Sequence, residues 1–116
     1  MLPLVLHSVR RFVKHKIDHI YLTSPYDQKI TRFAREHGCT FVNEDDLSPI
    51  PKAEISYICD GIDRSGWLLQ QLIKLNADSV CENDMYLVLD ADTVLIQDHI
   101  FFHGKTIFRF DKKYYE

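Results

Sequence analysis

The stretch Met85-Tyr86-Leu87-Val88-Leu89-Asp90-Ala91-Asp92-Thr93 decides both the predicted fold and the candidate chemistry. Its first five residues are apolar without a break, which is typical of a strand buried on both faces of a parallel sheet. Two carboxylates follow, two positions apart, and side chains at positions i and i+2 of an extended chain point the same way. The stretch therefore predicts a central strand with two convergent aspartates at its carboxyl end, where open α/β sheets bind ligands.

The residues before this stretch predict alternating helices and strands. Apolar residues recur at steps of three and four over residues 2–13, which indicates a helix with Pro3 in its first turn. The next expected elements are a mostly buried strand at residues 17–23, a helix opened by a capping box at residues 24–27 and stopped by Gly38, and a short strand at residues 40–43. This order implies a parallel sheet with crossover helices.

The rest of the chain predicts shorter elements. Pro49 and Pro51 exclude a regular helix or a central strand around them. The expected elements are an edge strand at residues 55–59, a turn at Asp60-Gly61, a helix at residues 66–76 capped by Ser65, and two short strands at residues 94–96 and 106–110, with Gly104 turning the chain before the second.

Together these elements predict an α/β fold with a Rossmann-like, mostly parallel sheet and flanking helices. With 116 residues the chain is at most one domain. A sheet of this kind normally opens with a strand, and this chain opens with a helix. We therefore expect residues 1–116 to form a single partial domain, incomplete at both ends, and the alternative is a genuine helix-first fold. A missing first strand would leave an open sheet edge, through which the chain would self-associate.

Composition excludes several classes of protein. The formal charge is 14 − 17 = −3, which argues against a nucleic-acid binder. No stretch approaches the ~20 apolar residues of a membrane span, and the apolar start precedes its charges, unlike a signal peptide. Cys39, Cys59 and Cys81 match no zinc pattern and are expected to be reduced thiols. These features predict a cytoplasmic protein.

The two aspartates predict a divalent-metal site. Two like charges held together need a cation, or one carboxylate must take up a proton. Hard ions such as Mg²⁺ use one or two carboxylates together with substrate phosphates. Asp90 and Asp92 are therefore the expected ligands of Mn²⁺ or Mg²⁺, which would hold a phosphorylated substrate. The alternative is a solvated turn after a strand, where aspartate is common.

Two unrelated enzyme classes have a similar motif. In A-type nucleotide-sugar glycosyltransferases, a strand-end Asp-x-Asp binds metal and nucleotide diphosphate. In haloacid-dehalogenase-type phosphatases, an apolar strand ends in Asp-x-Asp-x-Thr or Val, which Asp90-Ala91-Asp92-Thr93-Val94 fits. The phosphatase motif ends the first strand of its domain, and only 24 residues follow Asp92 here. The α/β pattern that precedes the motif favours the transferase.

Nearly the whole chain resembles an uncharacterised bacterial family of glycosyltransferase-like proteins. The most specific part of the resemblance is the helix Gly66-Trp67-x-x-Gln70-Gln71-x-x-Lys74, followed by Leu89-Asp90-Ala91-Asp92-Thr93. Residues 2–12, 17–23 and 41–47 extend it. Members of that family begin with a strand and loop that hold the nucleotide base, and they continue past the Asp-x-Asp with an acceptor region. This chain departs from the family in both places.

Carried onto this sequence, the resemblance implies a role for several side chains. Asp92 would be the direct metal ligand, and Asp90 would face the ribose or reach the metal through water. Lys74 would meet diphosphate charge, Gln70 would bond a sugar hydroxyl, and Arg64 would serve the phosphates as a bidentate donor. The alternative for Arg64, Gln70 and Lys74 is a solvated polar face.

Other polar or aromatic groups have weaker functional interpretations. Trp67 is expected in the core or in a cleft wall rather than as a base-stacking platform. His99 and His103 are expected to be scattered histidines, because the residues around them do not predict a helix. The acidic run at residues 44–46 is expected to be a solvated loop.

The sequence thus predicts a metal-dependent glycosyltransferase with a nucleotide-sugar donor and an unknown acceptor. No residue is identified as catalytic, and the fragment alone is expected to be inactive. One alternative is a haloacid-dehalogenase-type phosphatase with Asp90 as nucleophile. A second is a non-catalytic domain that keeps the fold and only binds its ligand.

Overall fold

The computed structural model describes residues 1–104 and 106–107, which fall into two compact units. One unit is formed by Met1–Asp18 together with the chain from Leu89 onward, and the other by His19–Val88. Both helices and short sheets are present, including one parallel pair of strands, so the predicted α/β class is confirmed in this coarse form.

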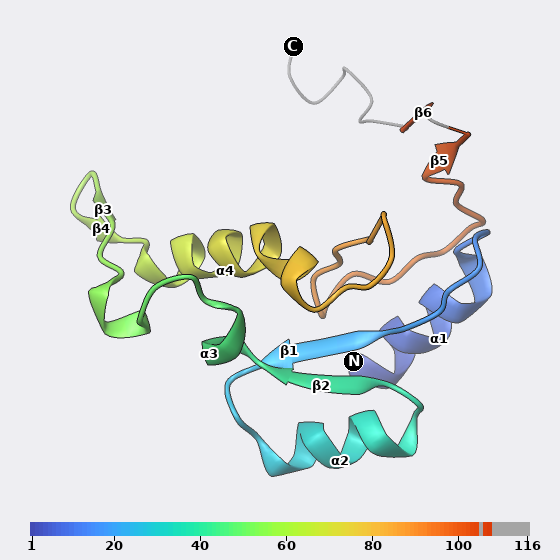
Figure 1. Cartoon of the computed structure of the whole chain (residues 1–116), viewed down its shortest axis with the longest axis horizontal. Coiled ribbons are helices and arrows are strands. Elements are labelled where there is room, and N and C mark those ends of the chain that lie inside the picture. Colours follow the sequence, from blue (N-terminus) through green and yellow to red (C-terminus); the bar gives the residue numbers. More distant parts are fainter. Residues whose placement is uncertain (105, 108–116) are drawn as a thin grey trace. The chain divides into compact units, whose positions relative to one another are not determined.

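A βαβ unit lies at the start of the second unit. The strands β1 (Tyr21–Ser24) and β2 (Thr40–Asn43) pair in parallel, with Tyr21 opposite Thr40 and Ser24 opposite Asn43, and α2 (Gln28–Glu36) connects them (Figure 1). The predicted crossover and the bounds of β2 are confirmed. The strand predicted from residue 17 begins only at Tyr21. Its partner β2 is four residues long, and these residues pair with Tyr21–Ser24. The other edge of β1 has no strand partner among the described residues, and self-association through it stays a prediction.

The start of α2 differs from the predicted capping box. Asp27, not Ser24, is the N-cap: its Oδ1 accepts hydrogen bonds from the backbone N–H groups of Lys29 (2.7 Å) and Ile30 (3.3 Å). An aspartate in extended conformation satisfies donors that the first helical turn leaves without partners. The predicted stop is confirmed, since α2 ends at Glu36 and Gly38 has φ +67°, a conformation that glycine adopts without strain.

The acidic run begins a short helix that the sequence analysis missed. Helix α3 spans Glu44–Leu47, and the Asn43 side chain accepts a hydrogen bond from the Asp45 N–H at 3.0 Å. Acidic residues in a first helical turn are favourable next to the positive end of the helix dipole. The helix buries Leu47, which is 2% exposed and whose carbonyl accepts a hydrogen bond from Asn76 Nδ2 at 2.8 Å.

A β-hairpin leads into the longest helix of this unit. The strands β3 (Ile58–Cys59) and β4 (Ile62–Asp63) are antiparallel, and the turn between them has φ +51° at Asp60 and φ +76° at Gly61. Positive φ at both central residues is the signature of a type I′ hairpin turn, so the Asp60-Gly61 turn is confirmed. The predicted edge strand shrinks to β3, which follows the 3₁₀ helix Lys52–Glu54.

Helix α4 spans Ser65–Leu75 and is followed by the 3₁₀ helix Ala77–Ser79. The predicted cap at Ser65 is wrong. Arg64 is the N-cap residue, and Ser65 is already helical. Its hydroxyl instead reaches back to the hairpin, as described below. Leu69 is 6% exposed and anchors the apolar side of the helix.

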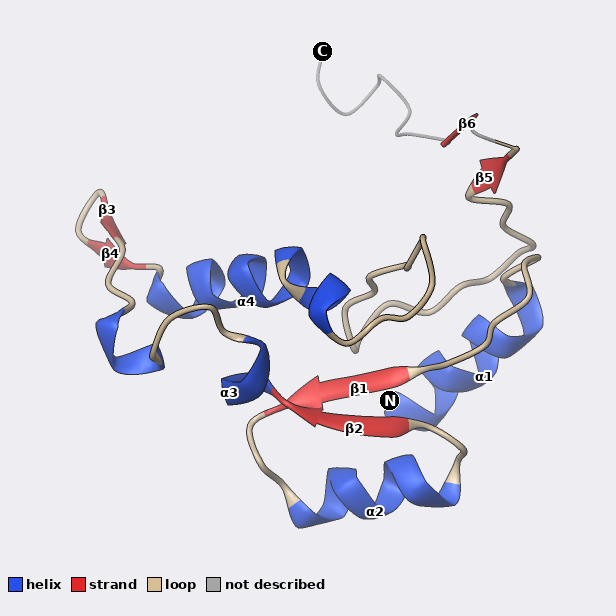
Figure 2. Cartoon of the chain, viewed as in Figure 1, coloured by secondary structure: helices blue, strands red, loops and turns tan. Residues whose placement is uncertain are grey.

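The central strand predicted at residues 85–89 is wrong. Figure 2 shows loop between the 3₁₀ helix that follows α4 and β5, and residues 85–88 are each between 40% and 45% exposed. A strand needs a neighbour to satisfy its backbone groups, and an apolar run does not supply one. In the described ranges each sheet has two strands, and neither residues 85–89 nor the predicted strand at residues 94–96 joins one. The Rossmann-like sheet is therefore not observed, and the parallel part is the β1–β2 pair.

The first unit is built on α1 (Leu2–Phe12), which confirms the predicted helix and its early Pro3. Val5, Leu6 and Ser8 are buried on it. The Ser8 hydroxyl donates to the Val5 carbonyl at 2.8 Å and accepts from the Leu95 N–H at 3.1 Å. This hydroxyl thus ties the helix to a segment 87 residues further along the chain.

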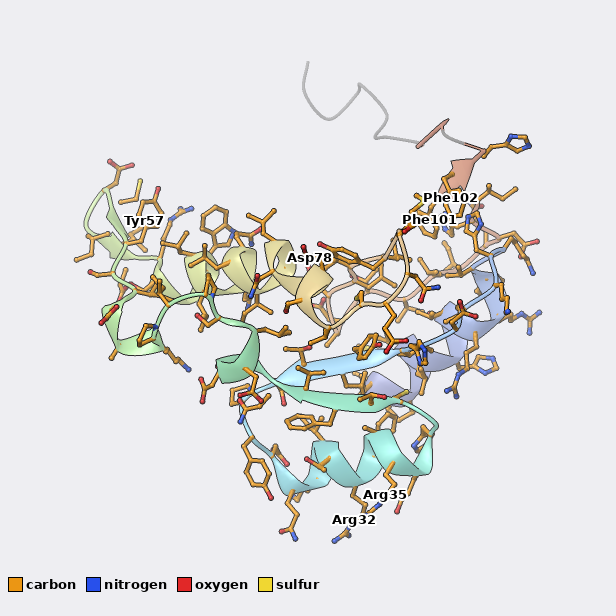
Figure 3. The ribbon with its side chains drawn as sticks, in the orientation of Figure 1. Arg32, Arg35, Tyr57, Asp78, Phe101 and Phe102 are labelled. Atoms are coloured by element: carbon orange, nitrogen blue, oxygen red, sulfur yellow. The ribbon has the colours of Figure 1, made fainter. Side chains whose placement is uncertain are left out.

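Residues after Leu95 are held against the end of α1. The His99 N–H donates to the Phe12 carbonyl at 2.7 Å. The Phe101 N–H donates to His15 Nε2 at 2.9 Å, and the His15 ring stacks on Phe102 with centroids 4.2 Å apart. Figure 3 labels Phe101 and Phe102. A second hairpin then pairs β5 (Phe102–His103) with β6 (Thr106–Ile107).

The turn of this second hairpin includes Gly104 at φ +57°, as predicted. Residues 108–110 of the strand predicted there lie outside the described part of the chain. The described residues contain no helix that is long and apolar enough to cross a membrane. Cys39, Cys59 and Cys81 are thiols, each of intermediate exposure.

We expect Ser8→Ala to lower the free energy of unfolding by about 1–3 kcal/mol, because the buried Leu95 N–H loses its acceptor. Chemical denaturation measures this. Ser79→Ala is the matched control: the Ser79 hydroxyl also donates to a carbonyl three residues back (Asn76, 2.8 Å), but it is exposed. Equal losses in the two variants would contradict the proposed role of the Ser8–Leu95 hydrogen bond.

Candidate functional site

The two predicted metal ligands lie on a tight turn. The Thr93 N–H donates to the Asp90 carbonyl at 3.0 Å, so Ala91 and Asp92 are the central residues of the turn. Asp90 and Asp92 are both exposed. The extended geometry assumed from their spacing is therefore wrong, because the chain reverses between them. They are presented by a turn and not by the end of a strand.

The donor set fits an open cation site rather than a closed one. In the part of the chain that the structure describes, no group of three or more His, Cys, Asp and Glu side chains gathers to hold a metal ion. A protein cage for Zn²⁺ or Ca²⁺ needs more ligands than two carboxylates. Mg²⁺ binds through one or two carboxylates when phosphate oxygens and waters complete its shell. Asp90 and Asp92 match that second pattern.

The predicted donor-binding residues lie along one side of α4. At 100° per residue, Trp67, Gln70, Gln71 and Lys74 fall within an arc of about 100°. We call these four residues the α4 polar face, and Arg64 directly precedes it as the N-cap. Gln70 and Arg64 are exposed, and Lys74 is half-buried. Gln70 and Lys74, one turn apart, therefore share a face of the helix, and their roles in donor binding stay predictions.

The carboxyl end of the α4 polar face is hydrogen-bonded to Tyr86. The Tyr86 hydroxyl donates to the Lys74 carbonyl at 3.3 Å. Carbonyls in the last turn of a helix have no partner within the helix, and this bond satisfies one of them. Tyr86 is thus a positioning group at this end of α4, which its place in an apolar run did not suggest.

The amino end of the α4 polar face carries an aromatic pair that the sequence analysis missed. The Trp67 ring lies 6.3 Å from the Tyr57 ring, centroid to centroid, at an interplanar angle of 34°. Trp67 is 54% exposed, so it does not lie in the core, and its alternative place in a cleft wall stays a prediction. Trp67 lies on the side of the helix opposite the buried Leu69, so its ring does not contribute to the core. The Asp60-Gly61 turn was the sequence feature that could have predicted this pair, because the turn returns the chain from Tyr57 to the start of α4.

Hydrogen bonds from Ser65 organise this end of the helix. The Ser65 hydroxyl accepts from the Tyr57 N–H at 2.9 Å and donates to Asp63 Oδ1 at 2.6 Å. The Ser65 N–H donates to the same oxygen at 2.9 Å. These two bonds, the hydroxyl bond first, hold the pKa of Asp63 below its ordinary value, because both favour the charged carboxylate. Asp63 is therefore a fixed negative charge beside the aromatic pair.

The remaining predicted candidates are placed as follows. His99 stacks on Phe101 with centroids 5.6 Å apart, and His103 lies in β5, so the two are not on one helical face. Glu44 pairs with Lys52 at 3.2 Å instead of standing in a solvated loop.

Comparison with known proteins identifies a family and no activity. A family described as "Family of unknown function (DUF6492)" matches residues 2–114. No curated protein and no solved structure matches the chain significantly.

Proposed function

We propose that this chain, which belongs to the family of unknown function DUF6492, is a metal-dependent glycosyltransferase with a nucleotide-sugar donor. The observation that carries the proposal is the Asp90–Thr93 turn, which presents two exposed carboxylates two positions apart. A site of this kind suits a cation that keeps phosphate oxygens among its ligands. The glycosyltransferase A-type fold is part of the same proposal, and the parallel β1–β2 pair with its crossover helix is the element that supports it.

Each proposed ligand contact follows from the chemistry of one side chain. Asp92, in the centre of the turn, is the direct metal ligand, and Asp90 contacts the ribose or reaches the metal through water. Arg64 offers a planar pair of donors that suits phosphate oxygens. Lys74 offers a point charge for the diphosphate, and Gln70 offers an amide for a sugar hydroxyl.

The proposed chemistry is transfer of a sugar from the nucleotide diphosphate to an acceptor hydroxyl. A bound Mn²⁺ or Mg²⁺ would supply Lewis-acid stabilisation of the departing diphosphate. The residues of this chain would bind and orient the donor, because carboxylates hold the cation and cationic side chains hold the phosphates. No general base is assigned to a residue of this chain.

Calorimetry with UDP and with GDP, each with and without Mn²⁺, tests the proposal. We expect at least one of the two nucleotides to bind about tenfold more tightly when Mn²⁺ is present, because phosphate oxygens complete the coordination of the ion. Equal affinity of both nucleotides with and without the metal would contradict the proposal.

The alternative activities give different results. A phosphatase with Asp90 as nucleophile would form a beryllofluoride adduct and hydrolyse a generic phosphate ester, and we expect neither. A non-catalytic binding domain would bind UDP or GDP with Mn²⁺ but would release no sugar from the matching sugar nucleotide, even with a panel of acceptors and with the chain in its natural context. The first pair of results would support the phosphatase, and the second would support the non-catalytic binding domain.

A further inference from the structure

The aromatic pair at the amino end of α4 is an exposed surface with a defined geometry. Tyr57 is 38% exposed and Trp67 is 54% exposed, and their ring centroids are 6.3 Å apart. Figure 3 labels Tyr57 at the end of the unit where the β3–β4 hairpin meets α4. We call Tyr57 and Trp67 the aromatic platform.

The backbone of Tyr57 is held in place by two hydrogen bonds. The Tyr57 N–H donates to the Ser65 hydroxyl at 2.9 Å, and the Tyr57 carbonyl accepts from the Arg64 N–H at 2.7 Å. The type I′ turn at Asp60-Gly61 fixes the return of the chain between them. The Tyr57 backbone therefore lies beside the first turn of α4 without a ligand, and binding does not have to order this part of the main chain.

Polar groups flank the two rings. The Asp63 carboxylate is fixed by both donors of Ser65, and it has lone pairs beyond those that Ser65 uses. Gln70, an amide with donors and an acceptor, is exposed one turn along the α4 polar face. The surface therefore combines two exposed aromatic rings with a carboxylate acceptor and an amide.

We propose that the aromatic platform binds a sugar ring, and that this sugar belongs to the acceptor of the reaction. The C–H faces of the sugar would lie on the rings of Tyr57 and Trp67. Its hydroxyl groups would donate to the Asp63 carboxylate and exchange hydrogen bonds with the Gln70 amide. The assignment of the sugar to the acceptor rests on the proposed transferase function, whereas binding of the sugar does not.

The geometry favours a sugar over a nucleobase. A base is planar and stacks flat on one ring, so rings tilted by 34° cannot both stack on the same face of it. A saturated sugar ring is puckered, and its axial and equatorial C–H groups can contact both tilted rings. Asp63 is a permanent acceptor, which matches the many hydroxyl donors of a sugar.

A protein partner is the alternative occupant of this surface. Ile58 (67% exposed) and Ile62 (56% exposed) on the hairpin extend the apolar area. A protein interface would use these two side chains as much as the rings, whereas a single sugar ring would depend on the rings and on Asp63. Substitution of the isoleucines therefore separates the two interpretations.

The experiment uses Trp67 as its own reporter, since it is the only tryptophan in the chain. Lactose, maltose and cellobiose are titrated separately into the protein, without nucleotide and without metal, while tryptophan emission is recorded. We expect at least one of them to shift the emission to shorter wavelength with a millimolar dissociation constant, because the sugar removes water from the indole. No shift with any of the three sugars overturns the proposal.

Variants locate the binding. Tyr57→Ala is expected to weaken the affinity about tenfold, and Tyr57→Phe to retain it, because the ring and not the hydroxyl makes the contact. Tyr26→Ala is the matched control, since Tyr26 is 71% exposed and lies against Phe41 outside the platform. Asp63→Asn tests the polar border and is expected to weaken binding several-fold. Circular dichroism verifies that each variant is folded.

Each further outcome decides between named interpretations. Loss of binding in Ile58→Ser and Ile62→Ser, with Tyr57→Ala unaffected, would overturn the platform. An emission shift with uridine or guanosine but not with the sugars would assign the rings to a nucleobase and would overturn the sugar proposal. Sugar binding in a protein that binds no metal–nucleotide complex would uphold the platform and remove the transferase function. Binding of the metal–nucleotide complex without any sugar binding would overturn the platform and leave the transferase proposal standing.

Discussion

Asp92→Asn is expected to abolish the metal-dependent part of nucleoside diphosphate binding. Asp92 is an exposed central residue of the Asp90–Thr93 turn, and the described residues place no third carboxylate, histidine or cysteine in a group with it and Asp90. With two protein carboxylates, removal of one negative ligand takes away half of the charge that the protein itself supplies to the cation. Calorimetry with Mn²⁺ should show the nucleotide affinity falling by at least tenfold, to the value measured without metal.

Two further variants make this result specific. Asp90→Asn is expected to have a smaller effect, because its proposed contact is to the ribose or to a metal-bound water. Asp98→Asn is the matched control: Asp98 is an exposed carboxylate of the same unit, paired at its surface with Lys14 at 3.3 Å. An unchanged metal effect in Asp92→Asn, or an equal loss in Asp98→Asn, would remove the proposed metal site.

Leu47→Ala is expected to lower the free energy of unfolding by about 2–5 kcal/mol, the range for emptying a buried leucine site. Leu47 is 2% exposed, and its carbonyl accepts the hydrogen bond from Asn76 Nδ2. Domains are stable by only about 5–15 kcal/mol in total, so this loss is a large fraction of the whole and the variant should unfold at a clearly lower denaturant concentration. Urea denaturation followed by circular dichroism measures the loss.

The control for Leu47→Ala is the same chemical change on the surface. Leu75, the last residue of α4, is 76% exposed, and Leu75→Ala is expected to change stability by less than about 0.5 kcal/mol. If the two variants lost equal stability, Leu47 would not be a core residue of its unit. A shift in the Leu47→Ala transition midpoint without a change in its slope would confirm that the variant changes stability and not the surface exposed on unfolding.

Features that depend on a few neighbouring residues were predictable from the sequence. Pro3 marks the start of α1, Gly38 ends α2 with a positive φ, and Asp60-Gly61 forms the type I′ turn. Each of these residues restricts its own backbone, so no distant contact is needed to reveal the element. The identity of the helix caps was harder, because Asp27 competed with Ser24, and Arg64 with Ser65, within a few positions.

The candidate site was predictable in its residue types and not in its geometry. Asp90, Asp92 and the α4 polar face are visible in the sequence, since their spacing follows from the motif and from the helical repeat. The placement of the aspartates on a turn depends on the conformation of the chain before them. The aromatic platform depends on a hairpin that brings Tyr57 back to Trp67, ten positions further along the chain.

The sequence by itself determined the three longer helices α1, α2 and α4, because a helix satisfies its backbone hydrogen bonds within its own segment and only needs an apolar side to bury. It also determined the Asp60-Gly61 turn, through the positive φ angles of those two residues. The tertiary structure alone decided which extended segments became strands. Residues 40–43 pair with β1, whereas the more apolar residues 85–89 have no strand partner in the described chain and remain a loop. A strand makes its backbone ladder hydrogen bonds with another segment, so its own composition cannot establish that it forms.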